Sequence, residues 1–553
     1  MIRKLIVKNY KILKDLQISL NPEFNVLVGQ NESGKSTILE AIGIATTGKL
    51  HFYPFDRQLR ANLFNNEIRY RYIEEVRNFR SKSTSVPELP KIIIEVYLED
   101  NDEVAIYKGK NNELREDAAG IRVEVSFNDE YADLYLELLR SGSIDDIPIE
   151  LYKVQYKYFS SKDVIYRFSP VKSVIIDASH KNYSHVVSNF INSNIEGLLS
   201  EQERMDISRE YRSNRNAFKR SNNIQKLNAE VSKRHKFDGR PVSIDFQEET
   251  IDAWKDQMTV SLAYVPFDNI GFGTQNVIKT ELAIQNSPDK VNVLLMEEPE
   301  NNLSYTNMTR MLEQIKNTTD KQIFIATHSS YVANKLSLQN LFLVDHGKSV
   351  PFSNLSDDTF KFFQKLPGFD TLRAVLARKI IFVEGPTDEL IVERCYIDEY
   401  EHLPIDDGID IIVARGLTFK RLCDITILLK KKVAVITDND EHPENMRDRY
   451  KDYYDNEYVE FFVEQNPKLH TIEPSVLAVN SDLDENGNFV PHLAFQYIVN
   501  QKTKRQMSFD ELDEFMEKDN NKVEWAFRVF DSPKKIEYPE NIKNAIHAVK
   551  EYS

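Results

Sequence analysis

A glycine-rich segment near the N-terminus has the residue types and spacing that bind phosphate groups. Residues 29–36 read GQNESGKS and fit the pattern GxxxxGK(S/T), between an apolar run at 24–28 and an amphipathic run at 36–45. Glycines in such a turn let backbone N–H groups approach phosphates, and the start of a helix adds partial positive charge. Lys35 is expected to reach the terminal phosphates of a nucleotide, and Ser36 to bind Mg²⁺. The residues expected to bind ATP here are Asn31, Gly34, Lys35, Ser36 and Thr37.

Two later runs of strand length end in polar residues. The run VNVLLMEEP ends with Glu297 and Glu298, and the run QIFIATHSS places His328 at its end. Two acids at the end of one strand can be a coincidence, and a lone histidine at a strand end is ordinary. The turn residues Asn302 to Ser304 lie between the two runs. This order after the phosphate loop favours a shared nucleotide site.

These elements resemble the nucleotide-binding core of ABC ATPases. Most ABC ATPases have Asp then Glu at the strand end, whereas the doubled glutamate here resembles that of OLD (overcoming lysogenization defect) proteins. The resemblance implies that Glu297 helps to hold Mg²⁺, that Glu298 polarises the attacking water and that His328 senses the γ-phosphate. Gly273 and Gln275, in the segment GFGTQ, resemble a degenerate ABC signature. In ABC proteins that signature closes on the ATP of a second copy, so the resemblance implies ATP contacts for both residues and a homodimer.

A second set of carboxylates follows in the C-terminal third. In IIFVEGPTDE, Glu384 ends an apolar strand, Gly385 allows a tight turn into a helix, and Asp388 lies one helical turn later. The run KKVAVITDND ends a second buried strand with Asp438 and Asp440. Carboxylates at positions i and i+2 of a strand end can point at one cation, and oxygen ligands suit Mg²⁺ or Mn²⁺. A lone DxD is common in loops, so the two strand-end motifs together predict the metal site.

The combination resembles the Toprim domain, and two later motifs resemble its OLD form. The segment from Thr471 to Glu473 is similar to the (S/T)xE element, and NKVEWA, with Lys522, to the KxxxA element. The resemblance implies that Thr471 supports the metal site and that Lys522 neutralises charge on a scissile phosphate. Lys534 and Lys535 are alternatives for the lysine, and Glu473 can instead be an ordinary acid at a helix start. The implied metal-binding and catalytic carboxylates are Glu384, Asp388, Asp438, Asp440 and Glu473.

These motifs predict an α/β protein with an ABC-type ATPase domain followed by a C-terminal Toprim domain. A chain of 553 residues is too long for one core, and we place the ATPase domain at 1–375 and the Toprim domain at 376–553. A large, partly helical insertion is expected at about 150–260, where we recognise no motif, and it is a possible dimerisation region. A linker is expected at 351–378 because Pro and Gly bracket it.

The charge distribution leaves room for a nucleic-acid partner despite a net charge of −16. Residues 201–240 contain 11 Lys and Arg against 6 Asp and Glu, a local net charge of +5. This segment is either a DNA-facing or dimerising surface or a solvated helix face. Only Cys395 and Cys423 are present, and no apolar run has membrane-spanning length. We therefore expect a cytoplasmic protein without a membrane partner.

The resemblance to OLD proteins implies an ATP-regulated, metal-dependent DNA endonuclease. It implies ATP and Mg²⁺ at the first site and Mg²⁺ or Mn²⁺ at the second. It also implies antiphage defence by a homodimer or higher homo-oligomer, alone, beside a helicase-like partner as in the Gabija system, or with a retron. Two alternatives stay open. One is a DNA-binding ATPase clamp whose Toprim domain is a scaffold for a separate effector, and the other is a topoisomerase-like enzyme with a nucleophilic tyrosine in a partner domain.

Overall fold

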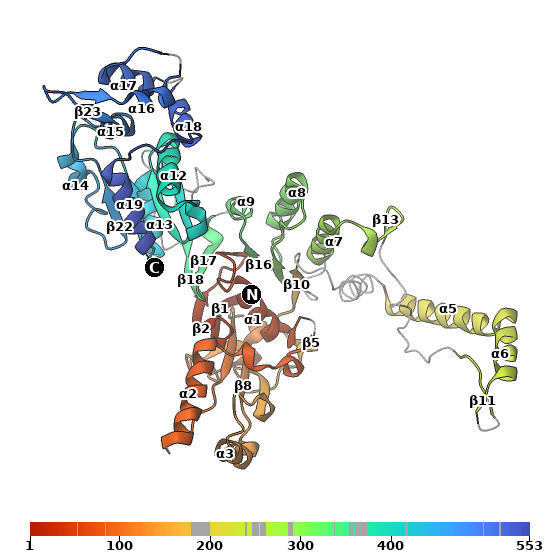
Figure 1. Ribbon diagram of the computed structural model, residues 1–553. Coiled ribbons are helices and arrows are strands. Elements are labelled where there is room, and N and C mark those ends of the chain that lie inside the picture. Colours follow the sequence, from red (N-terminus) through yellow and green to blue (C-terminus); the bar gives the residue numbers. More distant parts are fainter. Residues whose placement is uncertain are drawn as a thin grey trace. The chain divides into compact units, whose positions relative to one another are not determined.

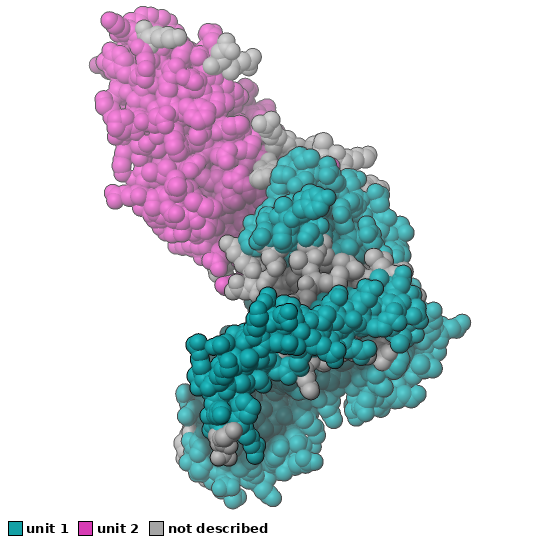
Figure 2. Space-filling model, turned by 90° about the vertical axis from the view of Figure 1, so that its right-hand side faces the viewer, with its two compact units in different colours: residues 1–25, 35–327 teal, residues 26–34, 328–553 magenta. Residues whose placement is uncertain are grey.

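The described chain forms two compact units. The first consists of residues 1–25 and 35–327, and the second of residues 26–34 and 328–553 (Figure 2). The structure is a computed structural model, and it describes all residues except 52, 83–84, 178–198, 238–239, 246–253, 255–260, 286–290, 337, 353–358, 360–372, 375–376, 415–417, 502, 519–520 and 553.

An antiparallel sheet forms one part of the first unit (Figure 1). Its central strand β6 (Ile92–Leu98) is buried along its whole length and pairs with β1 on one side and β8 on the other. A strand that is covered on both faces reads as a continuous apolar run, as IIIEVYL does. The strand order is β2-β1-β6-β8-β7, with β9 also paired to β8. The other strands are β1 (Ile2–Tyr10), β2 (Leu13–Ser19), β7 (Lys108–Gly109), β8 (Ala118–Phe127) and β9 (Tyr152–Tyr158).

Parallel strands form the second part of the first unit. The strand β15 (Val293–Glu297) lies in register between β10 (Ser173–Asp177) and β16 (Gln322–Thr327). Helix α1 (Lys35–Thr47) packs on these strands through a largely apolar surface. Both β9 and β10 lie within the predicted insertion at 150–260. However, β9 belongs to the antiparallel sheet and β10 belongs to the parallel strands. The added helical segment therefore begins after β10 in the described chain.

Helices and short hairpins complete the first unit. No described residue of α5 (Glu201–Lys219) or α6 (Asn222–Arg234) is buried, as expected for a charged helical segment. A capping box from Ser200 to Glu203 fixes the start of α5. The remaining elements are β4 (Lys49–Leu50), β5 (Tyr53–Pro54), α2 (Asn66–Lys82), α3 (Ala132–Ser141), β11 (Lys236–Phe237), β12 (Arg240–Pro241), β13 (Ser261–Leu262), β14 (Val265–Pro266), α7 (Phe272–Gln285) and α8 (Tyr305–Lys316).

The second unit contains a parallel sheet covered by helices. Its strand order is β20-β19-β21-β22 within the described residues, and all neighbouring pairs are parallel. Trp525 and Tyr396 are fully buried in the core that joins this sheet to its helices. The strands are β19 (Lys379–Val383), β20 (Ile409–Val413), β21 (Val433–Ile436) and β22 (Val459–Phe462), and the helices are α12 (Pro386–Tyr400), α13 (Thr418–Leu428), α14 (Met446–Arg449), α15 (Ile472–Val479), α16 (Leu493–Val499), α17 (Phe509–Glu517), α18 (Glu524–Phe530) and α19 (Glu540–Glu551).

The segment before this sheet contributes further strands to the second unit. The strand β3 (Phe24–Val28) runs from the first unit into the second and pairs in parallel with β17 (Leu341–Asp345). The strand β17 in turn pairs with β18. The other elements are α9 (Ser330–Lys335), β17 (Leu341–Asp345), β18 (Lys348–Pro351), β23 (Ser481–Leu483) and β24 (Phe489–Pro491).

The α/β class predicted from the sequence is confirmed by these parallel sheets and their helices. The predicted domains, 1–375 and 376–553, stay a prediction, and the predicted linker at 351–378 lies largely outside the described residues. No helix in the described ranges is both long and apolar enough to cross a membrane.

Candidate functional sites

The first residues of α1 face the carboxylate that ends β15. Lys35 is only 5% exposed, and burial lowers the pKa of its ammonium group, although three nearby glutamates act in the opposite direction. The Ser36 hydroxyl donates a hydrogen bond to Glu297. A serine hydroxyl beside a carboxylate is a suitable pair of oxygen ligands for Mg²⁺. Thr37 lies half-buried on the same helix, and Asn31 is exposed in the preceding turn.

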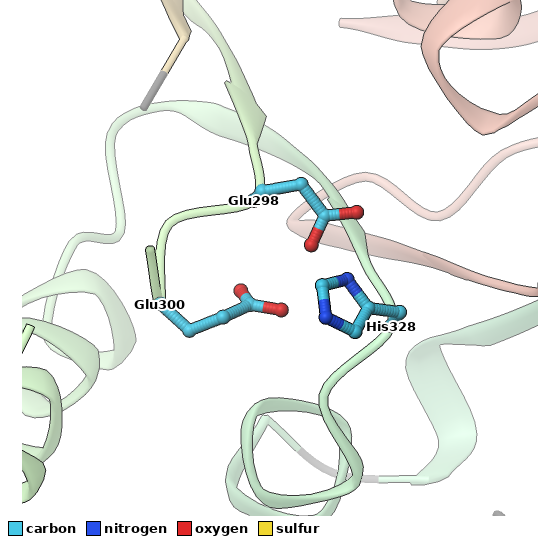
Figure 3. A group of neighbouring side chains, drawn as sticks. All are labelled: Glu298, Glu300 and His328. Atoms are coloured by element: carbon cyan, nitrogen blue, oxygen red, sulfur yellow. The ribbon is translucent and has the colours of Figure 1, made fainter. Parts of the chain in front are cut away.

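A carboxylate pair and a histidine form a group just after the ends of β15 and β16. Ligand atoms of Glu298, Glu300 and His328 all lie within 4.8 Å of one another (Figure 3). Glu298 has a positive φ of 46°, and its N–H donates to the carbonyl of Ala326 at 2.8 Å. The Thr327 hydroxyl donates to Glu300. The sequence reasoning missed Glu300, although the third acid in Glu-Glu-Pro-Glu was the available signal.

The glycine pair before α7 is set against the turn that follows β15. A Cβ atom at Gly273 would lie 2.1 Å from the carbonyl oxygen of Asn302, so only glycine allows this close approach. Gln275, which was expected to contact ATP, is 8% exposed. Its amide nitrogen donates to the carbonyls of Phe267 at 2.8 Å and Ile270 at 3.0 Å. In this structure the Gln275 amide holds the segment just before its own helix.

The second site begins where β19 and β21 end. These strands are parallel neighbours, so the residues that follow them lie at the same edge of the sheet. One carboxylate oxygen of Glu384, after β19, accepts the hydroxyl of Thr437. The same oxygen accepts the N–H of Asp438 at 3.1 Å. The two strand-end motifs predicted from the sequence are therefore in direct contact.

Several carboxylates are crowded at this edge. The N–H of Gly385 donates to Asp388 at 3.0 Å, and Asp388 is 8% exposed. Burial, followed by the charges of Glu473 and Glu384, raises the pKa of Asp388 to about 7. Burial and then the charges of neighbouring carboxylates, of which that of Asp388 is the largest, raise the pKa of Asp438 to about 9. Carboxylates that repel one another in a buried place are stabilised in their ionised form by a cation.

Glu473 and Lys522 adjoin this carboxylate group. Glu473 lies in the first turn of α15, after Thr471, and is 1% exposed. Its Oε1 atom is buried and has no hydrogen-bond partner among the described residues. Burial raises the pKa of Glu473, and the charge of Lys522 acts in the opposite direction. The backbone carbonyl of Lys522 accepts the hydroxyl of Thr387, the neighbour of Asp388, at 3.0 Å.

The three candidate lysines lie in different places. Lys522 is exposed beside the start of α12, where Asp388 is found. The Lys535 ammonium group donates to the carbonyl of Asp398. Asp398 lies on α12, ten residues after Asp388. Ten residues of helix span about 15 Å. Lys534 precedes Lys535, so among the three the structure places Lys522 beside the carboxylates.

The last predicted carboxylate has a different partner. Asp440 is exposed, has a positive φ of 50° and forms an ion pair with Arg449 of α14. The buried Asn439 fixes this loop, because its side-chain oxygen accepts the N–H of Glu441 at 2.9 Å. The sequence reasoning missed Asn439 and Arg449, since its motif covered only the two aspartates. The amide of Asn439 donates to the carbonyls of Glu464 (2.9 Å), Asn466 (3.0 Å) and Leu469 (3.3 Å).

Two family models match the chain, one over a long N-terminal stretch and one over a shorter C-terminal stretch. Residues 24–334, more than half of the chain, match a family described as "AAA domain, putative AbiEii toxin, Type IV TA system". Residues 375–440 match a family described as "Overcoming lysogenization defect protein-like, TOPRIM domain". These matches confirm the predicted order of an ATPase domain followed by a C-terminal Toprim domain.

Curated relatives match only a short part of the chain. The DNA replication and repair protein RecF of Staphylococcus haemolyticus is 33% identical over 79 residues, which are 14% of this chain and 20% of that protein. RecF of Bacillus cytotoxicus is 38% identical over 53 residues, or 10% and 14% of the two chains. RecF of Ligilactobacillus salivarius is 26% identical over 106 residues, or 18% and 28%. The chain therefore spans less than a third of the length of these relatives.

Solved structures of SMC head domains are also similar to this chain. The SMC head domain from Thermotoga maritima has a TM-score of 0.30 and 15% identity, and the match covers 63% of this chain and 98% of that domain. An SMC head bound to the C-winged helix domain of ScpA has a TM-score of 0.30 and 16% identity, with 63% and 97% covered.

Proposed function

The chain belongs to the OLD family, which joins an ABC-type ATPase to a Toprim domain, and from this premise we propose that it is an ATP-regulated, divalent-metal-dependent DNA endonuclease. The observation that carries the proposal is the contact between the ends of β19 and β21. There Glu384 accepts hydrogen bonds from Thr437 and Asp438 in the midst of further carboxylates. Such an arrangement suits the cleavage of a phosphodiester with the help of metal ions.

The residues at this edge fit a divalent cation. Glu473 has a buried carboxylate oxygen without a partner in the described chain, and oxygen atoms of this kind are what Mg²⁺ and Mn²⁺ bind. The raised pKa values of Asp388 and Asp438 have the same physical origin, namely unbalanced negative charge in a buried place. The residues that would hold the cations are Glu384, Asp388, Asp438, Asp440 and Glu473.

The chain's own residues would orient these groups and balance charge. A bound divalent cation supplies a Lewis acid that activates water and stabilises the leaving oxygen. The N–H groups of Gly385 and Asp438 fix the carboxylates of Asp388 and Glu384 through hydrogen bonds of 3.0 and 3.1 Å. Lys522, on the Glu473 side of the group, would neutralise negative charge that develops on the scissile phosphate.

The first site would bind and hydrolyse ATP. We assign Lys35 to the terminal phosphates, and Ser36 and Glu297 to Mg²⁺, because the serine hydroxyl already donates to that carboxylate. Glu298 would polarise the attacking water, and His328, in the group of Figure 3, would sense the γ-phosphate. Closure of two such sites in a homodimer or higher homo-oligomer would couple the nucleotide state to DNA cleavage.

Plasmid cleavage tests this proposal. We expect the native protein to nick or cut plasmid DNA with Mg²⁺ or Mn²⁺, and we expect the Asp438→Ala variant to lose this activity by at least 100-fold. The variant Asp452→Asn changes an exposed carboxylate of the same unit and serves as the matched control. Lys35→Ala tests the nucleotide site, since it should abolish ATP binding. Unchanged cleavage by Asp438→Ala would contradict the nuclease assignment, and a covalent protein–DNA adduct would favour a topoisomerase-like enzyme.

We propose a biological role in antiphage defence, supported by the family of the chain. A helicase-like protein or a retron would be a partner of such a nuclease in the cytoplasm. Phage plating on cells that express the native protein or Asp438→Ala tests this role. Equal plating on both strains, with or without neighbouring genes, would contradict it.

A further inference from the structure

Arg449 lies beside the carboxylate site although no motif contains it. Its Nη1 atom donates to Asp440 in an ion pair. The charge of Glu384 also acts on its guanidinium group, so the arginine is close to both strand-end motifs. The helix α14, which ends at Arg449, thus places a permanent positive charge at the edge of the acidic site.

An aromatic side chain supports the guanidinium group. The central carbon of the Arg449 guanidinium group lies 5.5 Å from the centre of the Tyr450 ring, within the range of a cation–π contact. Tyr450 is 4% exposed, and its ring packs against that of Phe461 with 4.8 Å between ring centres. The arginine therefore rests on a fixed surface.

Part of the guanidinium group is available to a ligand. Among the described residues, Nη1 alone donates a hydrogen bond from Arg449, and the side chain is 44% exposed. The Nε and Nη2 atoms remain for a planar ligand that accepts two hydrogen bonds, which is how arginine binds phosphate. The neighbouring Arg447 instead pairs with Asp455 through Nη2 at 2.9 Å, and the charges that act on it are those of Asp455, Tyr454 and Asp448 rather than those of the carboxylate site.

The site also needs a positive charge for its substrate. Glu384, Asp388, Asp438 and Glu473 would repel the phosphates of DNA, and bound cations together with a fixed cationic side chain would overcome this repulsion. Lys522 lies on the Glu473 side of the site, whereas Arg449 lies on the Asp440 side.

We propose that Arg449 binds a phosphate of the DNA strand at the cleavage site through Nε and Nη2, the atoms that its ion pair with Asp440 leaves available. The proposal rests on the proposed nuclease function. A divalent cation would be held by Asp440 together with the other carboxylates, and the remaining donors of Arg449 would face the DNA.

DNA binding by the variants Arg449→Ala and Arg449→Lys, with Arg447→Ala as matched control, tests the proposal. Fluorescence anisotropy with a labelled duplex, in Ca²⁺ to limit cleavage, should show about tenfold weaker binding for Arg449→Ala, as expected for loss of a charged hydrogen bond. Arg449→Lys should be intermediate and Arg447→Ala within about twofold of native. The slope of log affinity against log salt should fall in magnitude by about 0.9 for Arg449→Ala. Mn²⁺ binding without DNA should not weaken.

Two results would overturn this proposal and leave the proposed nuclease function standing. One is that Arg449→Ala binds DNA with the same affinity and the same salt dependence as the native protein, although the native protein cleaves DNA. This result would leave the nuclease function intact. The other is loss of Mn²⁺ affinity in Arg449→Ala without DNA, which would make the arginine a positioning residue for Asp440. A native protein that neither binds nor cleaves DNA with Mn²⁺ would overturn the nuclease function, and this inference with it.

Discussion

Replacement of Asp438 by asparagine is expected to stabilise the metal-free protein. Burial and the neighbouring carboxylates raise the pKa of this group from 3.8 to about 9 in the folded state. Between these values the folded chain holds a proton that the unfolded chain has lost, so the free energy of unfolding falls as pH rises. An asparagine of nearly the same shape has no such proton. Its stabilising effect is therefore small near pH 4 and grows toward pH 9.

The size of the effect follows from the pKa change. The pKa of Asp438 in the unfolded chain is 3.8, so pH 7 lies 3.2 units above it. At about 1.4 kcal/mol per unit, the raised pKa lowers the free energy of unfolding at pH 7 by about 4 kcal/mol. Asp438 is half-buried, so water screens part of this interaction. We expect the variant to gain about 2 kcal/mol at pH 7, or roughly 4–8 °C in the unfolding transition of the unit that holds the site.

Differential scanning calorimetry in EDTA measures this effect. The native protein, Asp438→Asn and the control Asp452→Asn are compared at pH 5, 7 and 8, and again with Mn²⁺. The metal should raise the transition of the native protein more than that of Asp438→Asn, because the variant has lost a ligand. A variant Asp438→Asn that is no more stable than native at pH 8 in EDTA, or that gains equally at pH 5, would contradict a raised pKa at Asp438.

Three further substitutions have definite expected outcomes. Lys522→Ala should lower the cleavage rate about 100-fold with unchanged Mn²⁺ binding, whereas the cleavage rate of Lys535→Ala should stay within about twofold of native. Equal losses in both variants would contradict the choice of Lys522. Gly273→Ala should lower ATPase activity at least tenfold, because the new Cβ would lie 2.1 Å from a backbone carbonyl oxygen. A Cβ at Gly271 would meet no atom within 4 Å, so Gly271→Ala should have nearly native ATPase activity. Asn439→Ala removes an amide that bonds three carbonyls, so urea unfolding should show a loss of about 2–4 kcal/mol, and a loss below about 0.5 kcal/mol would contradict the role of this amide.

The positions of strand-end residues could be predicted from the sequence because buried parallel strands read as short apolar runs. The runs before Glu297, Glu384 and Asp438 are β15, β19 and β21 in the structure. Parallel pairing of β19 with β21 then brings two of these ends together. The ends of such strands meet at one edge whatever the connecting helices contain.

Residues that reach the site from other elements could not be predicted in this way. Arg449 comes from a helix of four residues, and its pairing with Asp440 depends on the path of the loop between them. The choice between Lys522 and Lys535 depended on which end of α12 each one faces, and a short motif does not specify this. The motif that contains Gln275 likewise does not show that its amide bonds two backbone carbonyls just before α7.

The most direct test of the central claim is the metal dependence of plasmid cleavage by the native protein beside Asp438→Ala. We predict nicked or linear plasmid with Mn²⁺, no cleavage in EDTA, and at least a 100-fold lower rate for Asp438→Ala under the same conditions. Cleavage at the native rate in EDTA, or by Asp438→Ala with Mn²⁺, would contradict the assignment of these carboxylates to a metal-dependent nuclease site.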